Sequence, residues 1–152
     1  MRRCQMAVFK SNLTEVIAEI EARSAQNVVR GTEYMRSKLI DKVDTVGDGR
    51  VYKVPQTNVT HQASSEGNPP AVLTGALKNS FQTRYEHEKH VHVGYVGPVN
   101  IPYAKRLEFG FKGEDALGRV YDQEPRPYMT PTAFEEEENI GVILRGGVVP
   151  GE

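Results

Sequence analysis

The sequence predicts an α+β fold in which a long N-terminal helix packs on a small antiparallel β-sheet, with short helices after a hairpin and near the C-terminus. Three observations predict it: helical spacing of apolar residues over 12–40, two adjoining alternating runs after residue 80, and short amphipathic stretches near residues 104 and 132. A chain of 152 residues is long enough for a single domain, 1–152, with its own core.

The long helix is predicted from one apolar stripe with charged residues between its members. Asn12 suits the N-cap, Glu15 occupies the capping-box position, and Gly31 favours a break. A helix with a single apolar stripe needs a surface to lie on, and a sheet is the natural one. The stripe consists of Leu13, Val16, Ile17, Ile20, Val28, Met35 and Leu39.

The predicted strands fall into three runs, at 50–54, 80–85 and 90–96. The last two are joined by a polar tip at 86–89 and form a hairpin. In its second strand Val91, Val93 and Tyr95 share one face, while His90, His92 and Gly94 share the other. Residues 55–70, rich in Asn, Gln, Ser, Gly and Pro, are predicted to be a long surface loop.

Two short segments flank this hairpin and are predicted to hold its ends against the core. The segment 73–77, Leu-Thr-Gly-Ala-Leu, is typical of a chain reversal, and 103–109 of one amphipathic helical turn stopped by Gly110. Residues 110–125 are predicted to be a second long, mobile loop. A helix begins near Pro131 and runs to about Leu144. Residues 1–10 form an N-terminal arm and 146–152 a flexible tail.

Composition argues against several functional classes. The net charge of −1 does not favour a general nucleic-acid binder, and no run is apolar enough for a membrane helix. The single cysteine, Cys4, suits a reducing cytoplasm. Residues 1–43 carry eight basic and five acidic side chains, whereas 114–138 carry two basic and eight acidic ones. This polarity favours head-to-tail attraction between copies, although a scattered solvated surface explains it equally well.

The sequence contains no recognisable catalytic constellation, so we expect no catalytic residue, no cofactor and no metal site. His87, His90 and His92 invite a metal-dependent hydrolase as an alternative, but their spacing does not match the zinc-protease pattern. A DNA-binding module is a further alternative, supported only by the basic N-terminal third. Glu108 has two interpretations: an exposed helix residue, or a charge paired with Arg106 or Arg126 of the same or a neighbouring chain.

Taken in order, several motifs resemble the head–tail joining proteins of long-tailed bacteriophages, also called neck or tail-completion proteins. The resemblance covers about residues 49–134 and is carried by seven motifs in family-like order. They are 49–52 (GRVY), 61–64 (HQAS), 67–71 (GNPPA), 73–77 (LTGAL), 94–97, 103–110 (YAKRLEFG) and 126–129 (RPYM). The candidate site residues are Tyr52, Leu73, Thr74, Gly75, Leu77, Tyr103, Ala104, Leu107, Glu108, Phe109, Gly110, Arg126, Pro127 and Tyr128.

The resemblance implies a structural subunit without catalysis or cofactor. Such subunits form rings, with a hexamer favoured and a dodecamer as the alternative, between the DNA-filled head and the tail. The implied partners are other copies, head-closure or adaptor proteins, tail-terminator or tail-tube proteins, and double-stranded DNA as it passes through the channel. The implied location is the virion, assembled in the bacterial cytoplasm. A tail terminator that caps the tail tube is the alternative role.

This chain departs from the family pattern in two places. Leu73 stands where an acidic residue often precedes Thr-Gly, and residues 110–124 are longer than in many relatives.

Overall fold

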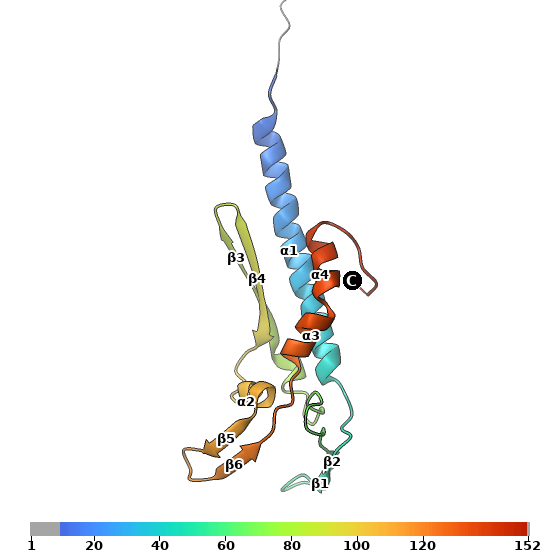
Figure 1. The fold of residues 1–152 in the computed structure, drawn as a ribbon, viewed down its shortest axis with the longest axis vertical. Coiled ribbons are helices and arrows are strands. Elements are labelled where there is room, and N and C mark those ends of the chain that lie inside the picture. Colours follow the sequence, from blue (N-terminus) through green and yellow to red (C-terminus); the bar gives the residue numbers. More distant parts are fainter. Residues whose placement is uncertain (1–9, 152) are drawn as a thin grey trace, which may run out of the picture.

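The computed structural model describes residues 10–151 and shows an elongated molecule built on one long helix (Figure 1). This helix, α1, spans Leu13–Val43. The hairpin of β3 (Phe81–Glu88) and β4 (Val91–Pro98) lies along one side of α1, and α3 (Met129–Glu135) and α4 (Glu137–Leu144) lie along another. The first turns of α1 extend beyond both (Figure 1).

The remaining elements form the end of the molecule opposite the α1 N-terminus (Figure 1). They are β1 (Val51–Lys53), β2 (Thr60–Gln62), the 3₁₀ helix η1 (Lys78–Ser80), α2 (Ala104–Phe109), β5 (Phe111–Glu114) and β6 (Val120–Gln123). The predicted α+β class is confirmed. The strands form three separate two-stranded antiparallel sheets, β1–β2, β3–β4 and β5–β6, in the described chain.

The long N-terminal helix is confirmed and Asn12 is its N-cap residue, but the expected break at Gly31 is wrong. Gly31 is buried because α4 packs on it, and a Cβ there would lie 3.6 Å from Leu144 Cδ2. The Asn12 side chain makes no capping hydrogen bond. Instead the Leu13 N–H donates to Ser11 Oγ at 3.4 Å.

The β3–β4 hairpin is confirmed, with a tighter tip than predicted. Pairing continues to Glu88 opposite Val91, so the turn is Lys89–His90 and His90 lies outside β4. The two faces of β4 separate as expected. The apolar residues Val91, Val93 and Tyr95 are exposed, whereas the other face of the strand turns toward α1.

Gly94 brings β4 close to α1. A Cβ on this residue would lie 1.9 Å from Thr32 Oγ1 and 3.2 Å from Val28 Cγ1, so no larger side chain fits without movement. The close contact continues along the hairpin, where Thr83 and Tyr85 hydroxyls both donate to the Glu33 carboxylate, at 2.8 and 2.7 Å. A steric fit and a shared hydrogen-bond acceptor therefore hold this part of the hairpin on α1.

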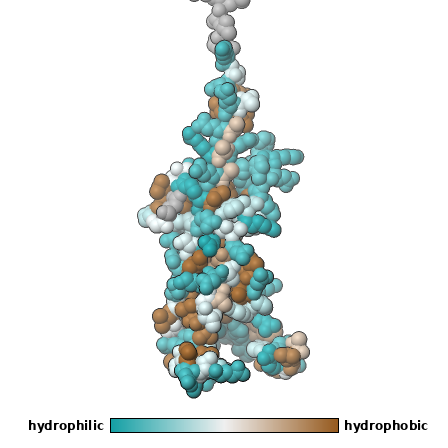
Figure 2. Space-filling model, turned by 180° about the vertical axis from the view of Figure 1, so that it is seen from behind, coloured by the Kyte–Doolittle hydropathy of each residue, from teal (hydrophilic) through white to brown (hydrophobic). Residues whose placement is uncertain are grey.

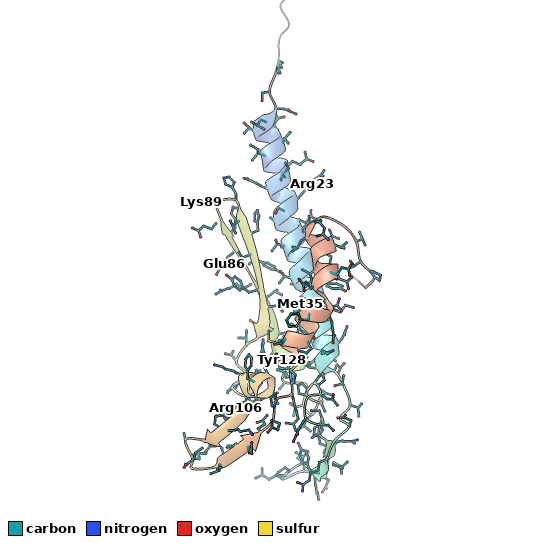
Figure 3. All side chains as sticks on the ribbon, in the orientation of Figure 1. Arg23, Met35, Glu86, Lys89, Arg106 and Tyr128 are labelled. Atoms are coloured by element: carbon teal, nitrogen blue, oxygen red, sulfur yellow. The ribbon has the colours of Figure 1, made fainter. Side chains whose placement is uncertain are left out.

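The core lies at the base of the hairpin, where Tyr128 packs edge-on against Phe81 with ring centroids 6.0 Å apart (Figure 3). It contains six buried side chains from five segments: Leu39, Val43, Leu77, Phe81, Ala104 and Tyr128. A second cluster, Tyr34, Ile143 and Val149, fixes α4 on α1. In the described part of the predicted tail, Val149 is buried and Arg30 donates to the Gly147 carbonyl at 2.9 Å.

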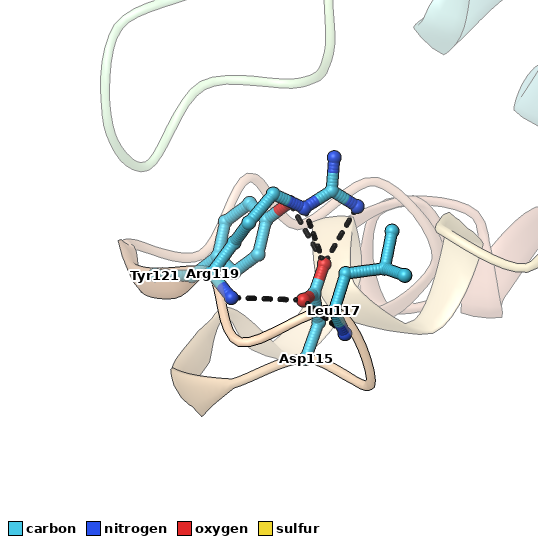
Figure 4. A network of polar contacts seen from close by, with 4 residues as sticks. All are labelled: Asp115, Leu117, Arg119 and Tyr121. Atoms are coloured by element: carbon cyan, nitrogen blue, oxygen red, sulfur yellow. Dashed lines mark hydrogen bonds and ion pairs between the residues drawn. The ribbon is translucent and has the colours of Figure 1, made fainter.

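Both segments predicted as long loops contain strands. In 55–70, β2 pairs with β1, placing His61 opposite Tyr52. In 110–125, β5 pairs with β6, and Asp115 closes the turn between them (Figure 4). Its carboxylate accepts the N–H of Leu117 at 2.9 Å, the Arg119 Nε–H at 2.8 Å and the Tyr121 hydroxyl at 3.2 Å. These hydrogen bonds, above all those from Arg119, hold the pKa of Asp115 well below its usual range.

The single C-terminal helix predicted for 131–144 is two helices, α3 and α4, separated at Glu136. Pro131 does lie in the first turn of α3, where its missing N–H costs nothing. At the break, the Glu136 carboxylate accepts hydrogen bonds from the Tyr34 hydroxyl and from Asn139 Nδ2, both at 2.7 Å. The Glu136 carboxylate at the break therefore connects α1, through Tyr34, with α4, through Asn139.

Candidate functional site

A cavity of about 400 Å³ lies between residues 70–78, the β1–β2 hairpin and α2. We call it the motif pocket, because half of the candidate site residues line it. These are Tyr52, Leu73, Thr74, Gly75, Leu77, Tyr103 and Leu107. Three motifs that are separate in the sequence thus meet at one concave surface.

The turn that forms one wall depends on Gly75. Its φ of +73° lies in the left-handed region, which a glycine adopts without steric cost. Thr74 Oγ1 accepts the Ala76 N–H at 3.3 Å, and the Val72 N–H donates to the Thr45 carbonyl at 3.0 Å. The first bond is made within the turn, and the second attaches the turn to the chain that follows α1. Leu77 then points into the core, while Leu73 remains half exposed.

The pocket lining is apolar with neutral polar groups. Tyr52 and His61 form its β1–β2 side and pack edge to face, with ring centroids 5.5 Å apart. Lys78, the one cationic lining residue, pairs with Asp44. No Asp or Glu is among the described residues that line the pocket. Such a surface suits an apolar side chain of another protein better than a charged or reacting ligand.

Glu108 matches neither of its two predicted roles. It is buried (6% exposed), and its carboxylate accepts the backbone N–H groups of Tyr128, Met129 and Thr130 at 2.8, 2.9 and 2.8 Å. These N–H groups begin α3 and have no partner within the helix. Burial raises the pKa of Glu108, but the hydrogen bonds from Thr130, Tyr128 and Met129 outweigh it, and the net pKa is lowered.

The other candidate residues on this side are structural. Ala104 and Tyr128 belong to the core, and burial raises the pKa of Tyr128 to about 12. Arg126 donates from Nε to the Ser64 carbonyl at 3.2 Å, and Pro127 follows it in the connecting segment that leads to α3. Gly110 ends α2 with a φ of +74°, as the glycine stop predicts.

Phe109 is not part of the core. It is 69% exposed, whereas its neighbours Ala104 and Glu108 on α2 are buried. The expectation that 103–110 holds the hairpin against the core is therefore correct for Ala104 and wrong for Phe109.

A second candidate surface is the first half of α1. Four apolar side chains at helical spacing are exposed there, with Leu13 at 63% and Ile20 at 61%. We call Leu13, Val16, Ile17 and Ile20 the α1 stripe. Figure 2 shows hydrophobic side chains on the surface near this end of the molecule. Farther along the same helix face, Gly31 and Tyr34 pack against α4 residues.

The three histidines of the hairpin do not form one cluster. His87 and His92 stack, with their Nδ1 atoms 3.0 Å apart, while His90 contacts the Glu21 carboxylate on α1. Over residues 10–151, no group of three or more His, Cys, Asp or Glu side chains is placed to hold a metal ion.

Sequence reasoning missed two carboxylates that shape loops, Asp48 and Asp115. Asp48 Oδ1 accepts the Ser65 N–H at 2.7 Å, and its Oδ2 accepts Asn68 Nδ2 at 2.6 Å. Ser65 and Asn68 lie 17 and 20 residues after Asp48, so no local sequence pattern indicates these bonds. Asp115 does carry a local signal, since an Asp that bonds the N–H two residues on is an Asx-turn, here followed by Gly118.

Within residues 10–151, no helix combines the length and the apolar character that crossing a membrane requires. Comparison with known proteins does not assign a family or a function to this site. No protein-family model matches the chain, and neither does any curated protein or solved structure.

Proposed function

We propose that this chain is a structural subunit of the neck of a long-tailed bacteriophage. Copies form a ring, with a hexamer favoured over a dodecamer, that joins the DNA-filled head to the tail and lets DNA pass along the axis. The observation that carries the proposal is the α1 stripe, an apolar helix face that a single subunit leaves in water.

The stripe supports assembly for an energetic reason. An isolated helix shorter than about 12–15 residues is marginal in water, and most helix stability in proteins comes from packing an apolar face. In the first two to three turns of α1, every residue from 11 to 20 is exposed, so this part gains little from its own subunit. Burial against a neighbouring copy would supply the missing contacts.

The elongated shape and the small core support the same conclusion. Among residues 10–151, nine apolar residues are buried, while large apolar side chains are exposed on α1, on the outer face of β4, on α2 and on α3. Exposed apolar surface of this extent is typical of subunits that are completed by partners. A closed ring needs two different complementary faces on each copy, and these surfaces lie on different parts of the chain.

The resemblance to head–tail joining proteins adds the biological setting. Half of its candidate residues line the motif pocket. The partners it implies are head-closure or adaptor proteins on one side and tail-terminator or tail-tube proteins on the other. The location that follows is the head–tail interface of the virion. DNA contacts the ring only while it passes through the channel.

Mass measurement of the purified protein tests the proposal, alone and mixed with DNA-filled capsids or with tail tubes. We expect a ring of defined copy number, formed in solution or on one of the two partners. Binding to filled capsids supports the neck role, whereas binding only to tail tubes supports a tail terminator. A protein that remains monomeric and binds neither is not a connector.

A further inference from the structure

The outer face of α2 presents one aromatic and one cationic side chain that the subunit does not use. Lys105 and Phe109 are four residues apart and therefore lie on the same side of the helix. Both are exposed, and Lys105 makes no ion pair with any residue in the described range 10–151. The adjacent side of α2, with Ala104 and Glu108, is buried.

A complementary surface lies on α3 and α4. There an open groove of about 760 Å³ has small residues, Ala133 and Gly141, beside the apolar side chains of Phe134 and Leu144. Phe134 is 73% exposed and Leu144 is 46% exposed. Ala133 leaves room there for a side chain of another molecule, whereas the Arg145 guanidinium, which also lines the groove, would lie 3.5 Å from a Cβ on Gly141. We call this surface the α3–α4 groove.

The rim of the α3–α4 groove is acidic. Glu137 and Glu138 line it from the first turn of α4, and both are exposed. Among the ion pairs of the described residues neither glutamate takes part, whereas Glu135 is paired with Lys42. With Glu135 paired to Lys42, the lining of the groove carries Glu137 and Glu138 against one cation, Arg145, so its rim has a net negative charge beside the apolar side chains.

We propose that the α3–α4 groove of one copy binds the outer face of α2 of a second copy, with Phe109 in the groove and Lys105 against Glu137 and Glu138. Charge complementarity selects this occupant, because α2 pairs an exposed aromatic with a free cation at the spacing of one helical turn. Phe109 and Phe134 are both mostly exposed, so the two faces do not cover each other within one subunit. The contact joins two different faces, as closure into a ring requires.

This inference rests on the proposed ring. Charge reversal distinguishes a failure of the groove contact from a failure of the ring. We would measure the mass distribution of wild type, K105E, the triple variant K105E/E137K/E138K and F109S over a range of protein concentrations. Far-UV circular dichroism and thermal melting verify that each variant is folded. Lys53→Glu, on the exposed strand β1, and Leu117→Ser, at the exposed β5–β6 turn, are matched controls for charge and apolar surface.

We expect K105E and F109S to raise the dissociation constant of the ring at least tenfold, and the triple variant to recover most of the loss. The controls should assemble like wild type. If K105E and F109S assemble at the same protein concentrations as wild type, the groove contact is wrong, whereas the proposed ring is unaffected. Equal losses in the controls overturn it as well, since the effect is then not specific to α2. A wild-type chain that never assembles overturns both the contact and the ring.

Discussion

Glu108 on α2 accepts the backbone N–H of Tyr128 at 2.8 Å, across 20 residues of sequence. The same carboxylate accepts the N–H groups of Met129 and Thr130, so a side chain from one helix caps the start of another. The Tyr128 ring meanwhile packs on Phe81 in the core. This relationship fixes α2, one wall of the motif pocket, relative to α3, one wall of the α3–α4 groove.

Glu108→Gln should destabilise the fold. An amide oxygen accepts more weakly than a carboxylate, and the amide NH₂ faces backbone donors at a buried position. Three charge-assisted hydrogen bonds are affected, so we expect a loss of about 2–4 kcal/mol in the free energy of unfolding. Urea denaturation measures it, with the exposed Glu138→Gln as control. A loss no larger than that of the control would show that the cap contributes little.

The stability supplied by Glu108 should depend on pH. Its pKa in the folded state is lowered from the ordinary value of 4.5, so the unfolded chain takes up the proton first as the pH falls. The contribution is therefore complete above about pH 5 and decreases as the pH falls through the unfolded and then the folded pKa.

Urea denaturation of wild type and Glu108→Gln at pH 7, 5, 4 and 3 measures this dependence. The difference between the two proteins isolates Glu108 from Glu33, Asp48 and Glu136, whose pKa values are also lowered. We expect the difference to shrink toward acid. A constant difference from pH 7 to 3 would exclude a cap that depends on the ionised carboxylate.

The elements that the sequence predicts best are those with a clear period. α1 and the β3–β4 hairpin repeat apolar residues over many positions, and α2 ends at a glycine with a positive φ. The β1–β2 and β5–β6 hairpins have strands of only three and four residues, largely exposed, so an alternating pattern is short there and predicted only the strand at 50–54. Their pairing comes from backbone hydrogen bonds and from side chains such as Asp115.

The candidate site was predicted only in part for a similar reason. The motif residues lie on three segments, and local patterns say nothing about which of their side chains converge. Glu108 has the local sequence of an exposed or paired charge, and its true partners are N–H groups about 20 residues later. A contact of that range depends on the tertiary fold.

Gly94→Ala should loosen the hairpin from α1. The new Cβ would lie 1.9 Å from Thr32 Oγ1, so β4 or α1 has to move, and overpacking of this kind costs about 1–3 kcal/mol. Gly97→Ala is the control, because a Cβ at that position meets no atom within 4 Å. Thermal unfolding compares the two variants. Equal melting temperatures for both would mean that the contact between β4 and α1 is not tight in solution.

Leu77 and Phe109 should respond differently to polar substitution, although both flank the hairpin. Leu77 belongs to the core, so Leu77→Asn should cost about 3–5 kcal/mol by creating a cavity and burying an amide. Phe109→Ser should change the free energy of unfolding by less than about 1 kcal/mol, because the ring is largely in water. Denaturant unfolding of the two variants tests this. Similar large losses for both would place Phe109 in the core.

Substitution in the α1 stripe should affect assembly and leave the monomer folded. Ile17→Ser with Ile20→Ser removes two exposed apolar side chains, and surface changes of this kind alter stability by only about 0.5 kcal/mol each. If the stripe is buried between copies, the double variant should raise the dissociation constant of the ring at least tenfold, because each buried aliphatic side chain contributes about 1.5–3 kcal/mol. Val29→Ser is the matched control, since Val29 is 41% exposed on the opposite side of α1. Sedimentation velocity over a concentration series gives both constants. Unchanged assembly of the double variant would show that the stripe faces solvent in the ring and would remove the main observation in favour of a connector.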